Sequence, residues 1–83
     1  MGDVIVIFRI MPESMDSFES IRSELQKFSP QRLEEEPVAF GLKAFMFTKL
    51  VPEKEGEMDK LEKALNGIKG VQSAEVVKLS RSL

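Results

Sequence analysis

One pattern occurs twice in this chain of 83 residues: an apolar run, a proline, and a helix-like segment that begins with Met-Asp. Residues 4–8 lead to Pro12, and residues 42–51 lead to Pro52. Proline cannot donate to a β-ladder, so each proline is expected to end a strand. The matched positions are Ile5, Ile7, Ile10, Pro12, Glu13, Met15, Asp16, Phe18 and Glu19 against Phe45, Phe47, Leu50, Pro52, Glu53, Met58, Asp59, Leu61 and Glu62. The repeat favours folds built from two strand–helix–strand units.

Both helix-like segments carry apolar residues at steps of three or four, the spacing of one helix face. The first is expected to start with Ser14 as its N-cap and to stop at Ser29-Pro30. Asn66-Gly67 and Gly70 are expected to end the second. The two apolar stripes are Met15, Phe18, Ile21, Leu25 and Phe28, and then Met58, Leu61, Leu65 and Ile68.

The remaining segments complete a four-stranded pattern. Residues 31–36 are polar and acidic, which favours an edge strand, and residues 71–79 are expected to form a last strand. Residues 37–41 and 53–57 are expected to be loops, and 80–83 a tail. The prediction is therefore one α+β domain over residues 1–83. Its fold is ferredoxin-like (βαββαβ), with a four-stranded antiparallel sheet, its two most apolar strands in the centre, and two helices on one face.

The direction of the strand side chains follows from alternation along each strand. In the strand expected over residues 42–51, Lys43 and Lys49 point to the same face as Phe45 and Phe47 and would lie toward the strand ends. The opposite choice for that strand would bury Ala44, Met46, Thr48 and Leu50. The set expected to face the helices is Val4, Val6, Phe8, Ile10, Phe45 and Phe47. The helix-free face then carries Ile5 and Ile7, which fits either a partner surface or a merely hydrophobic sheet.

The composition excludes several classes of chemistry. The chain has no cysteine and no histidine, which removes thiolate catalysis, Ser-His pairs and most zinc sites. Its net charge of −2 does not favour nucleic-acid binding, which usually accompanies a basic excess. The apolar runs are too short to cross a bilayer, so no membrane association and a cytoplasmic location are expected. No phosphate-binding loop or dinucleotide motif is present.

Two clusters are better explained by folding than by ligand binding. Glu34, Glu35 and Glu36 alternate sides on a strand and do not converge on one metal ion. The methionines at 11, 15, 46 and 58, without cysteine or histidine, are expected to pack in the core. No cofactor or metal is therefore expected.

Two further features are not explained by folding alone. Phe40 lies in a loop between Pro37 and Gly41, where a ring either covers its own core or anchors a partner. Judged by the residues alone, covering the core is favoured. Arg81 has no acidic residue within the last six positions, and on the same grounds a solvated tail residue is favoured.

Two other functions suit the same fold. A ligand- or RNA-binding module would need Phe45 and Phe47 on the exposed face, where aromatic rings stack on bases. An acylphosphatase-like enzyme would need an anion-binding loop after the first strand. Residues 11–14 are acidic and lack glycine, which argues against the enzyme.

The stretch Pro37-Val38-Ala39-Phe40-Gly41-Leu42-Lys43 resembles the proline-x-glycine-aromatic-glycine-isoleucine-lysine motif of the translation elongation factor 1-beta family. The opening residues 6–14 and residues 34–44 are still closer to the short archaeal members, which consist of the exchange domain alone. The similarity extends over essentially the whole chain and its closing Ser-Arg.

This resemblance implies guanine-nucleotide exchange on the GTPase elongation factor 1-alpha, without covalent chemistry. It implies that Phe40 packs against the GTPase, together with Pro37, Gly41 and Lys43 of the same motif. It also implies that Arg81 corresponds to a family lysine that reaches the magnesium and phosphate site. Arginine keeps the charge but is a planar fork rather than a compact ammonium, and Ser82 adds a residue before Leu83. The resemblance thus favours a partner contact for Phe40 over a cover on the core, and a functional cation for Arg81 over a solvated tail residue.

Overall fold

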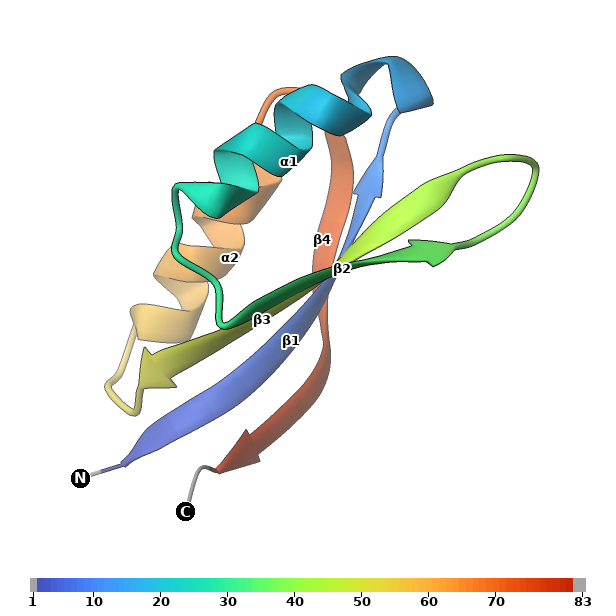
Figure 1. Ribbon diagram of the computed structural model, residues 1–83. Helices are drawn as coiled ribbons and strands as arrows, with labels where there is room; N and C mark the ends of the chain where they lie inside the picture. Colours follow the sequence, from blue (N-terminus) through green and yellow to red (C-terminus); the bar gives the residue numbers. More distant parts are fainter. Residues whose placement is uncertain (1, 82–83) are drawn as a thin grey trace.

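The computed structural model describes residues 2–81 and contains two helices packed on one face of a four-stranded sheet (Figure 1). The sheet order is β2-β3-β1-β4, and every neighbouring pair is antiparallel. This confirms the predicted ferredoxin-like fold, with the two most apolar strands in the centre. The elements in chain order are β1 (Asp3–Pro12), the 3₁₀ turn η1 (Met15–Ser17), α1 (Phe18–Gln26), β2 (Arg32–Pro37), β3 (Lys43–Pro52), α2 (Glu57–Asn66) and β4 (Val71–Arg81).

The core lies between the sheet and the helices, and it contains the strand residues predicted for it. Phe45 and Phe47 are fully buried. Phe45 stacks on Phe18 of α1 with ring centroids 4.3 Å apart, and Phe47 meets Phe8 edge-on at 6.3 Å. The buried residues of β1 are Val4, Val6, Phe8, Ile10 and Pro12. The inward-facing side chains of the strands and the apolar stripes of the two helices therefore pack into one shared core.

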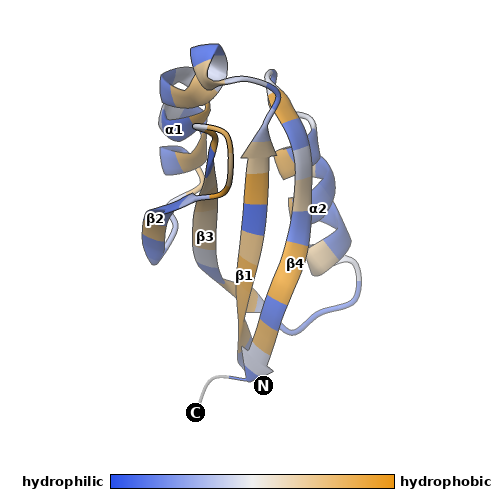
Figure 2. Cartoon of the chain, turned by 90° about the vertical axis from the view of Figure 1, so that its right-hand side faces the viewer, coloured by the Kyte–Doolittle hydropathy of each residue, from blue (hydrophilic) through white to orange (hydrophobic). Residues whose placement is uncertain are grey.

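The helix-free face of the sheet is less apolar than the core and carries an ion pair. Ile5 and Ile7 are half-buried there, and Ala44 on the same face is fully buried opposite Glu36 in β2. Arg9 donates from Nη2 to a carboxylate oxygen of Glu36 at 3.3 Å. In Figure 2 the helices lie behind the sheet, β1 is mostly hydrophobic, and hydrophobic and hydrophilic residues alternate along β4.

Several element boundaries differ from the expectation. The second strand ends at Pro37 and the third begins at Lys43, so the loop covers residues 38–42 and not the predicted 37–41. The first helix opens with the 3₁₀ turn η1, and Ser14 caps it without a side-chain hydrogen bond. The largest correction is at the end of the chain, where β4 continues through Arg81 because Arg81 pairs with Val4 of β1. Ser80 and Arg81 therefore belong to the sheet and not to a tail.

The acidic run lies on the edge strand β2, and its carboxylates do point to opposite faces. Glu35 faces α1 and forms ion pairs with Arg22 and with Lys43, the latter at 3.7 Å. Glu36 faces the other side and pairs with Arg9. Glu35 and Glu36 are therefore tied to neighbouring elements on opposite faces of the sheet.

Gly70, just before β4, occupies a position that glycine alone fits. Its φ is +93°, and an added Cβ would lie 2.7 Å from Cβ of Ser17. We expect Gly70→Ala to lower the free energy of unfolding by about 2–3 kcal/mol, because a backbone strain and a close contact act together. Urea denaturation measures this loss. Gly56→Ala is the matched control, since Gly56 also has a positive φ of +86° but has nothing within 4 Å of the added Cβ. Equal losses in the two variants would contradict the role of the contact.

Candidate functional site

The loop between β2 and β3 closes as a tight hairpin turn with an aromatic residue at its tip. The backbone N–H of Leu42 donates to the carbonyl of Ala39 at 2.9 Å. The two residues between them have positive φ, +53° at Phe40 and +78° at Gly41. This combination is that of a type I′ turn, which favours asparagine, aspartate or glycine at both central positions. A phenylalanine in the left-handed region is rare and strained.

The side chain of Phe40 is fully exposed, at 103% of its reference area. The interpretation of this ring as a cover on its own core, favoured from the residues alone, is therefore wrong. Nearby, Val38 is also exposed, at 47%. Fold stability alone gives no reason for a large exposed ring on a strained backbone. This tip is therefore a strong candidate for a partner contact.

The other predicted residues of this loop flank the turn. Pro37 and Lys43 are cross-strand partners at the end of the β2–β3 ladder, and Gly41 supplies the second positive φ of the turn. The ammonium of Lys43 lies 3.7 Å from a carboxylate oxygen of Glu35 and stays half exposed. These residues thus hold the ring of Phe40 away from the body of the molecule.

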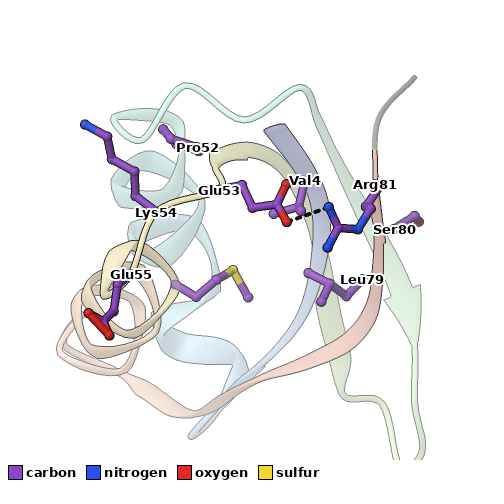
Figure 3. Close-up of a pocket in the computed structure, with 9 residues that line it drawn as sticks. Val4, Pro52, Glu53, Lys54, Glu55, Leu79, Ser80 and Arg81 are labelled. Carbon is purple, nitrogen blue, oxygen red and sulfur yellow. Dashed lines mark ion pairs between the residues drawn. The ribbon is translucent and has the colours of Figure 1, made fainter. Parts of the chain in front are cut away.

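Arg81 is the last described residue, at the end of β4. Its Nη1 donates to Oε2 of Glu53 at 2.6 Å (Figure 3), and the arginine side chain remains 76% exposed. The interpretation of Arg81 as a solvated tail residue is therefore wrong, because sheet pairing fixes its backbone and a carboxylate holds its guanidinium. The additional residue Ser82 lies outside the described residues.

The Arg81–Glu53 pair lies beside a pocket of about 430 Å³ that the sequence did not predict. Leu79 on its wall is 56% exposed. The lining residues are Val4, Pro52, Glu53, Lys54, Glu55, Met58, Leu79, Ser80 and Arg81. Figure 3 shows Glu53 and Arg81 pointing toward one another from the loop after β3 and from β4.

The structure does not bring the predicted site residues into one cluster. Phe40, Pro37, Gly41 and Lys43 lie at the hairpin end of the sheet, where Ile10 pairs with Phe45. Arg81 lies at the other end, where it pairs with Val4 of β1 and where Val4 also pairs with Val51 of β3. Figure 1 shows these two ends far apart along a molecule with principal extents of 41 × 21 × 17 Å. The candidate site is therefore a pair of separate contacts.

Sequence reasoning missed Glu53 as a member of the site. The sequence predicts only a charged loop at Glu53, although the position of this residue directly after Pro52 in the repeated pattern marks the end of a strand. Strand ends in an antiparallel sheet lie next to the neighbouring strand's opposite end. The ends of β3 and β4 both lie next to the start of β1, so the extension of β4 to Arg81 puts Arg81 and Glu53 at the same end of the sheet.

Other kinds of site find no support in the described part of the chain. The burial of Phe45 and Phe47 excludes the base-stacking surface that an RNA-binding module would need on those rings. Among residues 2–81, no three or more acidic side chains come together in a group able to hold a metal ion. Separately, neither helix between those residues has the length and apolarity to cross a bilayer.

Comparison with known proteins gives a consistent result. The model of the EF-1 guanine nucleotide exchange domain matches residues 5–81. A protein of Methanosphaerula palustris named elongation factor 1-beta is 41% identical, covering 96% of this chain and 98% of its own length. Proteins of the same name from Methanothermobacter thermautotrophicus and Sulfolobus acidocaldarius are 38% and 42% identical, covering 98% and 95% of this chain and 98% and 96% of their own lengths.

The matched region contains the whole described sheet except its first residues, and it includes both the hairpin turn and Arg81. The family resemblance seen in the residues is thereby confirmed over nearly the full length. The chain belongs to the elongation factor 1-beta family of guanine nucleotide exchange domains.

Proposed function

We propose that this protein promotes exchange of GDP for GTP on elongation factor 1-alpha by binding the nucleotide-free GTPase and disturbing its magnesium and phosphate site. The protein makes and breaks no covalent bond in this role, and it acts in the cytoplasm during translation. Phe40 anchors the complex, and Arg81 is the group that enters the nucleotide site. Pro37, Gly41 and Lys43 hold the anchor in place.

The exposed ring of Phe40, carried on a backbone with positive φ, is the single observation that carries the proposal. A fully exposed phenylalanine at a turn position suited to asparagine or glycine is unfavourable for the isolated fold. Aromatic side chains that project from a rigid scaffold are typical anchors of protein interfaces. The membership of the exchange-domain family supports elongation factor 1-alpha as the partner.

The separation of Phe40 and Arg81 fits a contact at two points. The antiparallel sheet between them is a rigid frame, so two ends of one long molecule reach two distant regions of the GTPase. Magnesium bridges the phosphates and holds the nucleotide, so a cation that disturbs this site lowers the barrier to release. By linkage, the nucleotide must weaken binding of this protein by the same factor by which the protein weakens binding of the nucleotide.

Release of labelled GDP from purified elongation factor 1-alpha tests the proposal. We expect release to accelerate when this protein is added, and capture of the GTPase by this protein to be stronger without GDP than with it. Absence of both effects would overturn the proposed function.

Arg81→Ala tests the role of the terminal cation. We expect about a tenfold slower GDP release, because a charged group that acts at a desolvated site is worth about 1.4 kcal/mol or more. Arg81→Lys is the matched control, since it keeps the charge that the family motif supplies and is expected to keep most of the activity. Circular dichroism checks that the fold is intact. A normal rate in Arg81→Ala would contradict this assignment.

A further inference from the structure

We infer that Glu53 is a positioning residue for Arg81: it orients the guanidinium so that its remaining N–H groups point toward the GTPase. This inference rests on the proposed function and adds a residue to it. The evidence is the 2.6 Å contact from Nη1 of Arg81 to Oε2 of Glu53 and the way in which the fold fixes both backbones.

The backbone of Glu53 is held at the end of the sheet. Pro52 pairs with Asp3 across β1 and β3, and the backbone N–H of Glu53 donates to the carbonyl of Gly2 at 3.1 Å. The Glu53 side chain is 37% exposed, about half the exposed fraction of Arg81. The carboxylate is therefore the better fixed partner of the pair, and the arginine side chain is the one that it constrains.

A guanidinium has several N–H donors in one plane, so it can bind two acceptors at once. The contact with Glu53 uses Nη1, and the arginine side chain remains 76% exposed. Arg81 can thus keep its bond to Glu53 while it offers other donors to a phosphate or carboxylate of the partner. A lysine in this position would act as a point charge and would need no such orientation.

The pair contributes little to the stability of the fold. Exposed ion pairs stabilise proteins only weakly, and β4 is already held by its ladder to β1. The long arginine side chain has considerable rotamer freedom, and a fixed carboxylate restricts it before the partner binds. Glu53 therefore favours formation of the complex, because it orders the side chain of Arg81 before the partner binds.

A double-mutant cycle with GDP release as the readout tests this role. We expect Glu53→Ala to slow release by about two- to fivefold, the effect of an exposed ion pair. In the Arg81→Ala background, the same substitution is expected to have no further effect. The effect of Glu53→Ala should also shrink as salt is raised, because exposed charges are screened. Glu55→Ala is the matched control, since it removes a carboxylate from the same loop without touching Arg81, and the wild-type rate is expected.

Exchanging the two charges separates orientation from stability. The variant with Glu53→Arg and Arg81→Glu can restore an ion pair, but it moves the cation to the loop after β3. We expect its thermal stability to stay near that of the wild type and its exchange rate to fall at least as far as that of Arg81→Ala.

Three results would overturn the inference. Glu53→Ala could leave the rate unchanged, it could accelerate release, or it could slow release equally with and without Arg81. The third result would mean that Glu53 contacts the GTPase itself. All three are distinct from failure of the proposed function, in which the wild-type protein would not accelerate GDP release at all.

Discussion

Phe40→Asn is expected to weaken exchange on elongation factor 1-alpha by about 30-fold or more while making the protein more stable. The loss follows from the removal of an anchor ring, since such residues contribute about 2 kcal/mol or more to binding. The gain follows from the turn: asparagine tolerates positive φ, and Phe40 has a φ of +53°. Relief of this strain is expected to raise the free energy of unfolding by about 0.5–1 kcal/mol and the melting temperature by a few degrees.

GDP release and thermal denaturation together measure these opposite changes. Phe40→Tyr keeps the ring and is expected to keep most of the exchange activity. Val38→Ser is the matched control for surface apolarity, because Val38 lies in the same loop and is 47% exposed. If Phe40→Asn exchanged nucleotide at the normal rate, the hairpin tip would not be the anchor.

Phe47→Ala is expected to have the largest effect on stability, a loss of about 3–5 kcal/mol. The ring of Phe47 is fully buried and lies 6.3 Å from the rings of both Phe8 and Phe28. Its removal leaves a cavity among the strands and α1 that the well-packed core closes only in part. A chain of 83 residues has a total stability of about 4–12 kcal/mol, so this variant is expected to lose a large fraction of its stability.

Urea or thermal denaturation followed by circular dichroism measures the loss. Met46→Ala is the control, because Met46 is the neighbouring residue on the helix-free face and is only half-buried. Its expected loss is about 1 kcal/mol. A small effect of Phe47→Ala would mean that the ring is not part of the core and would reopen the stacking hypothesis.

Strand order and core composition could be predicted because both depend on local patterns. The apolar runs before Pro12 and Pro52 give two strong strands, and the steps of three and four give two helix stripes. Alternation then assigned Phe45 and Phe47 to the interior, where both are fully buried. Each of these inferences uses residues that are close together in the chain.

The candidate site was predicted less completely, and its two errors concern a turn conformation and a strand register. The residues alone favoured a buried Phe40 and a free Arg81, and the structure contradicts both. The conformation of Phe40 depends on a single turn type with positive φ, which asparagine or glycine at its position would have indicated and phenylalanine does not. The pairing of Arg81 with Glu53 depends on the register of β4 against β1 over the whole length of both strands.

By itself, the sequence determined the class of fold, the two central strands, the core phenylalanines and the family to which the chain is similar. These follow from periodicity, from proline stops and from a motif that is continuous in the chain. Only the tertiary structure decided that Phe40 projects from a strained turn, that Arg81 lies at the opposite end of the sheet, and that Glu53 holds it. The conformation of Phe40 depends on a turn type that phenylalanine does not indicate. The placement of Arg81 and its contact with Glu53 arise from residues far apart in the chain, and no local pattern encodes the register that brings such residues together.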